Sequence, residues 1–184
     1  AAYMQQAHPA MKTIVITGAS DGIGAEMARQ LAAQHKDQVA LVLAARNETL
    51  LHAVADECTA LGAQALVVLT DVSIEAQCHR LIAMAVDRFG GIDALINNAG
   101  MSAQALFADV TREDLHWYED LMRVNLWGSV WCTHAALPHL LGMEKLEQPN
   151  LADTVVTAEG VAVLTRLPSL RAVNLTHTRA EGSS

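Results

Sequence analysis

The chain has 184 residues, of which 12 are Lys or Arg and 20 are Asp or Glu, so its formal net charge is −8. Hydrophobic residues make up 52% and charged residues 17%, which excludes a chain that is disordered throughout and suits one domain with a real core. The acidic balance argues against nucleic acid as a partner. No apolar run approaches the roughly 18 residues of a membrane span, so we expect no membrane partner either.

Residues 1–10 carry neither the basic nor the apolar region of a secretory signal, and we interpret them as a tail before a single domain over residues 11–184. The three cysteines, Cys58, Cys78 and Cys132, lack the spacing of a metal site, and an odd number argues against a disulfide framework. The eight histidines show no metal-binding spacing. We therefore predict free thiols, no metal and a cytoplasmic location.

Short apolar runs rich in β-branched residues alternate with helical patterns along the chain. The runs cover residues 13–17, 39–43, 65–69 and 92–96. Their nearly continuous apolar character is typical of parallel strands that are covered on both faces. Alternating strands and helices with crossover-length connections predict an α/β fold, a doubly wound parallel sheet of the Rossmann type that is incomplete over these residues.

Each expected helix has an apolar face and a recognisable end. The faces comprise Ile23, Met27 and Leu31 in the first helix, Leu51, Val54, Cys58 and Leu61 in the second, and Cys78, Leu81, Ile82, Ala85 and Phe89 in the third. Ser73 is expected to cap the third helix, and Gly62 and Gly90 to end the second and third. Thr111 and Asp114 are similar to a capping box that opens a long helix toward Pro138.

A glycine-rich turn, Thr17-Gly18-Ala19-Ser20-Asp21-Gly22-Ile23-Gly24, follows the first expected strand and opens the first helix. Glycines at this position allow a tight turn and bring backbone N–H groups up to a pyrophosphate at the helix N-terminus. The placement between strand and helix makes the pattern far more specific than three glycines in any loop. A packing role remains an alternative for Gly24 alone.

Three further motifs follow the glycine turn in order: Asp71-Val72 after the third strand, Asn97-Asn98-Ala99-Gly100 after the fourth, and Val124-Asn125 in the next helix. With the turn, they resemble the short-chain dehydrogenases/reductases in both order and spacing. The resemblance covers residues 11–141. It implies an oxidoreductase that moves a hydride between a nicotinamide dinucleotide and an alcohol/carbonyl substrate.

The resemblance also implies roles for particular residues. The implied cofactor-binding set is Gly18, Ser20, Asp21, Gly22, Ile23, Gly24, Arg46, Asp71, Val72, Asn98, Ala99 and Gly100. Asp71 would accept from the adenine amino group, although it could equally cap the turn before Ser73. Asn97 is expected to hold neighbouring backbone. Asn125 matches the family's catalytic asparagine, which positions a water in a proton relay, although an Asn beside Gly128 can also be structural.

The end of the second strand bears on the choice between NAD and NADP. An NAD enzyme usually places a carboxylate there to bind the ribose hydroxyls. This chain has Ala45 followed by Arg46, and arginine suits the 2′-phosphate of NADP. We therefore expect NADP(H), with NAD(H) second; the alternative is a surface arginine at a helix start.

The Tyr-x-x-x-Lys pair and the preceding Ser of the family have no counterpart in the 184 residues. Residues 157–162 resemble the start of the family's final helix, and residues 172–176 its last strand. We therefore expect a gap near residues 140–146, with the missing groups in an absent segment. Two alternatives stay open: a truncated, inactive nucleotide-binding or regulatory chain, and an interaction protein with a relict glycine loop.

The long helix after Thr111 carries a compact apolar block of Leu126, Trp127, Val130 and Trp131. In the resembling family this helix packs across a two-fold axis, so we expect a homodimer or homotetramer. The alternative is that both tryptophans face the core of one protomer. The substrate itself, beyond an alcohol or carbonyl, is not readable from the sequence.

Overall fold

A computed structural model describes residues 11–102, 107–140, 155–157 and 179–181. The chain divides into two compact units, residues 1–137 and residues 138–184. The first unit holds the sheet, its covering helices and all of the predicted site residues.

The first unit is built on a parallel sheet of four described strands. They are β1 (Lys12–Thr17), β2 (Val39–Ala45), β3 (Gln64–Leu69) and β4 (Ala94–Ile96), in the order β3-β2-β1-β4. β1 pairs in parallel with β2 on one side and with β4 on the other. This arrangement confirms the predicted α/β fold, and each strand lies within two residues of the expected run.

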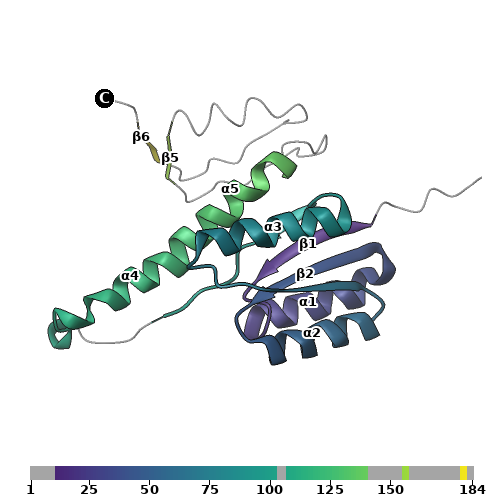
Figure 1. Ribbon diagram of the computed structural model, residues 1–184, viewed down its shortest axis with the longest axis horizontal. Helices are drawn as coiled ribbons and strands as arrows, with labels where there is room; N and C mark the ends of the chain where they lie inside the picture. The colour runs from purple at the N-terminus through teal and green to yellow at the C-terminus, as the bar shows by residue number, and fades with distance from the viewer. Residues whose placement is uncertain (1–10, 103–106, 141–154, 158–178, 182–184) are drawn as a thin grey trace, which may run out of the picture. The chain divides into compact units, whose positions relative to one another are not determined.

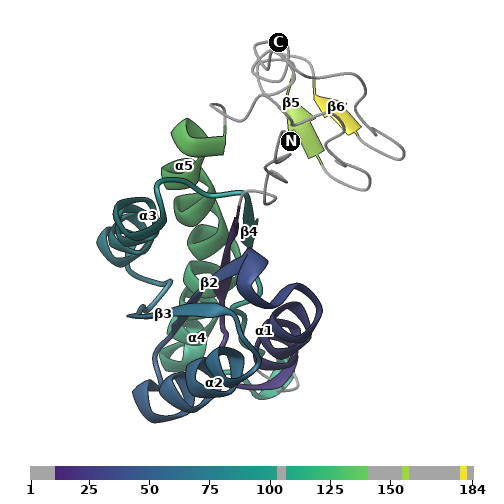
Figure 2. The same cartoon turned by 90° about the vertical axis from the view of Figure 1, so that its right-hand side faces the viewer.

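Helices cover both faces of this sheet, as a doubly wound fold requires. α1 (Gly22–His35) and α2 (Glu48–Ala60) lie on one face, and α3 (Glu75–Phe89) and α5 (Gly128–Leu140) on the other (Figures 1 and 2). The 3-10 turn η1 (Lys36–Gln38) joins α1 to β2. All seven residues of β2 are buried, which explains why this strand is apolar throughout.

The segment before α5 is a series of short helical pieces rather than one regular helix. It contains η2 (Phe107–Asp109), η3 (Glu113–Leu115), α4 (His116–Met122) and the π-helical segment η4 (Arg123–Trp127), which runs into α5. The predicted capping box is confirmed: the backbone N–H and hydroxyl of Thr111 donate to Asp114 Oδ2 at 3.0 and 2.8 Å. The π segment was not predicted.

The core of this unit lies between the sheet and its helices, and two expected members are outside it. α1 packs through its small residues Gly24, Ala25, Ala28 and Ala32. Ile23 is 75% exposed because it stands in the first turn, and Leu61 is also exposed, so placing these two side chains on buried faces was wrong. The expected faces of α2 and α3 are otherwise buried, apart from half-buried Phe89.

The predicted helix ends at Gly62 and Gly90 are confirmed, whereas the predicted cap of α3 at Ser73 is wrong. Gly62 and Gly90 have φ of 103° and 83°, the left-handed backbone that ends a helix. α3 begins at Glu75 after Ile74, which makes no side-chain capping bond. The hydroxyl of Ser73 instead donates to Asp71 Oδ1 at 2.7 Å, because that carboxylate already accepts the Ser73 backbone N–H.

Apart from the last residues of α5, the described part of the second unit is one pair of short strands. β5 (Val155–Thr157) and β6 (Arg179–Glu181) pair in parallel. Thr157 therefore ends a strand and does not open a helix, contrary to the prediction. The strand expected at residues 172–176 and the gap expected near residues 140–146 lie outside the described residues, except for Leu140 at the end of α5. No helix in the described ranges is long and apolar enough to cross a membrane.

Candidate functional site

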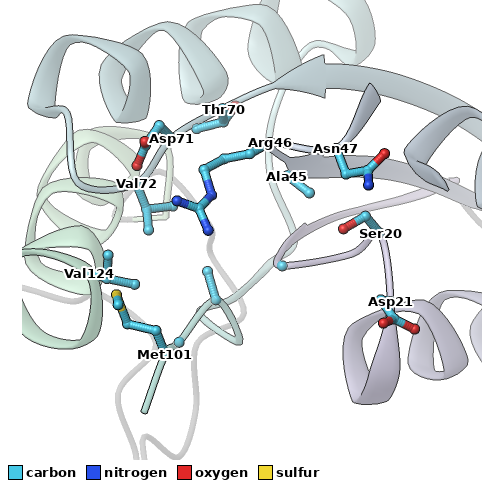
Figure 3. Close-up of a pocket in the computed structure, with 13 residues that line it drawn as sticks. Ser20, Asp21, Ala45, Arg46, Asn47, Thr70, Asp71, Val72, Met101 and Val124 are labelled. Carbon is cyan, nitrogen blue, oxygen red and sulfur yellow. The ribbon is translucent and has the colours of Figure 1, made fainter. Parts of the chain in front are cut away.

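The main pocket lies where the strand order reverses. From β1 the chain proceeds outward through β2 and β3, then returns to place β4 on the other side of β1. In open α/β sheets, ligands bind at the carboxyl ends of the strands beside this switch point. A pocket of about 310 Å³ occupies that position (Figure 3). Its lining residues are Gly18, Ser20, Asp21, Ala45, Arg46, Asn47, Thr70, Asp71, Val72, Ala99, Gly100, Met101 and Val124.

The glycine turn brings β1, α1 and the end of β4 closer together than any side chain would allow. Gly18 has φ of 67°, and a Cβ on it would lie 2.8 Å from Ala99 Cα. A Cβ on Gly24 would lie 2.3 Å from the Gly18 carbonyl oxygen. Gly24 therefore serves close packing between α1 and the turn, which was the alternative role considered for it. The bare backbone of Gly18 forms part of the pocket wall.

Thr17 and Asn98 tie the two central strand ends together under the pocket. The Thr17 hydroxyl accepts the backbone N–H groups of Asn98 and Ala99, both at 3.0 Å. In return, Asn98 Nδ2 donates to the carbonyls of Thr17 and Gly18 at 3.1 and 3.2 Å. The Asn98 side chain thus holds the start of the glycine turn. The Thr17 hydroxyl holds the chain after β4, a role that the motif spacing did not reveal.

Asn97 makes no side-chain hydrogen bond to the backbone of the described residues, contrary to the prediction. Its Nδ2 donates to the hydroxyl of Thr133 at 3.0 Å, so it joins the end of β4 to α5. The backbone-holding role expected of Asn97 belongs to Asn98 instead.

Arg46 stands between the last residue of β2 and the N-cap of α2. Asn47 caps that helix by accepting the Leu50 backbone N–H at 3.1 Å, which fixes the chain just after Arg46. The Arg46 side chain is exposed and directed into the pocket (Figure 3). Among the described residues its guanidinium has neither an ion-pair partner nor a hydrogen-bond partner. It is therefore a cation available to a ligand anion.

Asp71 is held in place at the end of β3 by two neighbours. Its Oδ1 accepts the backbone N–H and the hydroxyl of Ser73 at 2.9 and 2.7 Å. Its own backbone N–H donates to Gln77 Oε1 at 2.8 Å. The carboxylate therefore caps the turn before Ser73, which was one of the two expected roles. Its Oδ2 makes no hydrogen bond with the described residues, so it has acceptor capacity for a ligand.

Asn125 lies in the middle of the π segment, and its side chain is hydrogen-bonded to the chain that follows β4. Its Nδ2 donates to the Met101 carbonyl, and its Oδ1 accepts the Met101 N–H, both at 2.8 Å. Both functional groups of the amide thus position Met101, which borders the main pocket. A second, more open pocket of about 440 Å³ adjoins the first, and Asn125, Ser102 and Ser129 are among its lining residues. Isolated π turns are frequent at functional sites.

The structure brings eight of the twelve predicted cofactor residues to the main pocket. They are Gly18, Ser20, Asp21, Arg46, Asp71, Val72, Ala99 and Gly100. The other four, Gly22, Ile23, Gly24 and Asn98, do not line it. Five lining residues had not been predicted as cofactor-binding, and each adjoins a predicted site residue in the sequence: Ala45, Asn47, Thr70, Met101 and Val124.

The described residues around this pocket combine groups that can bind an anion with groups that can accept hydrogen bonds. A helix N-terminus, a wall of bare glycine backbone, an arginine with no partner among the described residues, and a held carboxylate surround one pocket of ligand size. Asp21 caps α1 by accepting the Gly22 N–H at 2.7 Å. This capping bond helps to fix the first turn of α1 beside the pocket.

Curated proteins similar to the chain are named 11-beta-hydroxysteroid dehydrogenases. One from Pinus massoniana is 41% identical over 130 residues, and 11-beta-hydroxysteroid dehydrogenase A from Arachis hypogaea is 43% identical over 130 residues. The match covers 70% of this chain in both cases, but only 35% and 36% of those proteins. The chain therefore spans little more than a third of the length of these relatives.

Solved structures with the same fold include a short-chain type dehydrogenase/reductase from Mycobacterium marinum, with a TM-score of 0.66 and 28% identity. The match covers 82% of this chain and 56% of that one. A mutant of a short-chain dehydrogenase/reductase from Serratia marcescens gives a TM-score of 0.64 and 27% identity, covering 72% and 53%. The model of the short chain dehydrogenase family matches residues 12–150, and the chain therefore belongs to this family of oxidoreductases.

Proposed function

We propose that the chain forms the nucleotide-binding part of an oxidoreductase that transfers a hydride between NADP(H) and an alcohol/carbonyl substrate. Membership of the short chain dehydrogenase family supports the reaction class, and that family uses nicotinamide cofactors. The observation that carries the choice of NADP is the Arg46 guanidinium, which points into the pocket and is unpaired among the described residues.

The pocket wall offers a proposed partner for the 2′-phosphate, the pyrophosphate, the adenine and a ribose of the dinucleotide. Arg46 would bind the 2′-phosphate with charge-assisted hydrogen bonds. The turn from Gly18 to Asp21 would hold the pyrophosphate at the start of α1. Asp71 and Val72 would contact the adenine, and Gly100 the ribose. The bound nicotinamide would supply the hydride acceptor or donor.

The chain's own contribution to the chemistry would be positioning. Asn125 fixes Met101 through both of its amide groups, and Met101 lines both pockets. The segment after β4 would therefore stay in place where the two pockets meet. We propose that the proton-donating Tyr, its Lys and the Ser belong to a part of the protein outside these 184 residues. The relation of Asn125 to a relay water stays a prediction.

The substrate class can be narrowed only by analogy with relatives. Curated proteins that match this chain are named hydroxysteroid dehydrogenases, and we propose hydroxysteroids as the first alcohols to assay. The second pocket, beside Asn125 and Ser129, is the proposed place for the reacting alcohol or carbonyl.

We also propose that the protein assembles as a homodimer or homotetramer through the outer face of α4, η4 and α5. Trp127 is 47% exposed and stacks on Trp131 with ring centroids 5.8 Å apart. Leu126 and Val130 are exposed as well, which speaks against a face turned wholly to the protomer core. Light scattering at micromolar concentration tests this: a homodimer or larger is expected, and a monomer contradicts it. A Trp127→Lys variant should shift the equilibrium toward monomer.

Calorimetric titration with NADPH and with NADH tests the proposed cofactor. We expect NADPH to bind ~10–100-fold more tightly, because one charge-assisted contact to the 2′-phosphate contributes about 1.5–3 kcal/mol. Equal affinities, or tighter binding of NADH, would overturn the NADP assignment. Binding without turnover of any hydroxysteroid by the whole protein would favour the alternative of an inactive nucleotide-binding chain.

A further inference from the structure

Asp71 has one carboxylate oxygen to offer a ligand, because the described residues engage its other hydrogen-bonding groups. Its Oδ1 accepts the backbone N–H and the hydroxyl of Ser73. Its carbonyl accepts the Ile74 backbone N–H at 3.1 Å, and its own N–H donates to Gln77 Oε1 at 2.8 Å. Oδ2 is therefore the group of Asp71 that is left for a ligand of the main pocket, which Asp71 lines (Figure 3).

The partners of Asp71 differ in the element to which they belong. Ser73 and Ile74 belong to the turn that begins at Asp71 itself, so they would move together with it. Gln77 instead lies in the first turn of α3, and α3 packs through its buried face against β1, β2 and β3. The Gln77 side chain therefore ties the backbone of Asp71 to an element that is fixed on the sheet.

The bond from Gln77 lies where the pairing of the strands ends. The Thr70 backbone N–H donates to the Ala45 carbonyl at 2.9 Å, which continues the pairing of β3 with β2. Asp71 is the next residue, and its N–H is bonded to Gln77 rather than to a strand. Gln77 is half-buried and does not line the main pocket. Any effect of Gln77 on a ligand there would therefore pass through Asp71.

We propose that Gln77 is a positioning residue that makes the pocket selective for adenine over hypoxanthine, because it fixes the place of Asp71 Oδ2. This inference rests on the proposed nucleotide function. A fixed Oδ2 can accept from the amino group of adenine. Hypoxanthine carries a carbonyl oxygen in place of that amino group and an N–H at the adjacent ring position. A held carboxylate would face the carbonyl oxygen, whereas a loosened one could shift to accept the N–H.

Calorimetry with adenosine 5′-monophosphate and inosine 5′-monophosphate tests the selectivity, because the two differ only at this edge of the base. The wild type should bind the adenosine compound about tenfold more tightly. Gln77→Leu should lower this preference to about threefold or less. Gln77→Glu keeps an oxygen that accepts the Asp71 N–H, so it should retain the preference. Gln30→Leu, at an exposed glutamine bonded to Glu26 on α1, is the matched control.

A double-mutant cycle separates positioning from a general loss of stability. If Gln77 acts through Asp71, then adding Gln77→Leu to Asp71→Asn should leave the ratio of the two affinities unchanged. A merely structural role would weaken both monophosphates alike in either background. The proposal is overturned if Gln77→Leu alone leaves the ratio at its wild-type value. It is also overturned if Gln77→Leu lowers the ratio by the same factor with and without Asp71→Asn.

The backbone amide of Asp71 gives a second measurement that needs no ligand. Its hydrogen should exchange with solvent faster in Gln77→Leu than in the wild type, because the bond to Oε1 protects it. Equal exchange rates by NMR would overturn the positioning role. If the wild type binds neither monophosphate, the proposed nucleotide function fails and the base selectivity fails with it. If the wild type binds both equally, the selectivity alone is overturned.

Discussion

Asn125 and Met101 exchange two hydrogen bonds of 2.8 Å each, one in each direction between the side-chain amide and the backbone. The Asn125 side chain thus satisfies the N–H and the carbonyl of Met101, as a neighbouring strand would do for the chain after β4. It does so from η4, where the π turn expands the helix by one residue.

Asn125→Leu should therefore destabilise the fold, because it removes both partners of the Met101 backbone. We expect a loss of about 1–3 kcal/mol in the free energy of unfolding, measured by urea denaturation. Asn97→Ala is the matched control, since it removes one exposed side-chain bond to Thr133 and should cost less. If the two substitutions lower the free energy of unfolding equally, the two bonds from Asn125 to Met101 do not stabilise the fold more than one exposed side-chain bond does.

Gly24→Ala should also destabilise, for a steric reason. The new Cβ would meet the Gly18 carbonyl oxygen at 2.3 Å and Asn98 Nδ2 at 2.5 Å. Overpacking of this kind costs about 1–3 kcal/mol, which thermal unfolding would report as a lower Tm. A Cβ on Gly91 would have no atom within 4 Å, so Gly91→Ala should leave Tm nearly unchanged. An unchanged Tm for Gly24→Ala would contradict the packing described at the turn.

Asp71→Asn should weaken NADPH and NADH binding equally, because both cofactors carry the same adenine. The amide oxygen can still accept from Ser73, but the other atom becomes an N–H₂ group that cannot accept from the adenine amino group. We expect about a tenfold loss by calorimetry for each cofactor. Asp87→Asn, at an exposed carboxylate on α3, is the control. A loss confined to one cofactor would contradict the adenine contact.

The strands and their alternation with helices could be predicted because β2 and its neighbours are short, largely apolar runs, a pattern typical of a doubly covered sheet. The helix faces were harder. Periodicity put Ile23 in the core, but small residues such as Gly24 and Ala28 let α1 approach the sheet, and Ile23 projects outward from the first turn. Periodicity also cannot register the single extra residue of a π turn.

Within the site, the residues that bear on a ligand through their own chemistry, such as Arg46 and Asp71, could be predicted from position and charge. The residues that hold others could not. Thr17, Gln77 and Met101 act through contacts that are far apart in sequence or depend on backbone groups. The role of Ser73 could not be predicted for the same reason. Its hydroxyl could either cap α3 or bond Asp71, and in the structure it donates to Asp71.

The proposed role of Arg46 can be tested with fragments that need no catalytic residues. Adenosine 2′,5′-bisphosphate and adenosine 5′-monophosphate differ only in the 2′-phosphate, so their affinities isolate that contact. The wild type should bind the bisphosphate ~10–100-fold more tightly by calorimetry, and Arg46→Ala should abolish the difference while leaving the monophosphate unchanged. Arg112→Ala, at an exposed arginine outside the pocket, should behave as wild type. If Arg46→Ala weakens both fragments equally, or neither, Arg46 does not bind the 2′-phosphate.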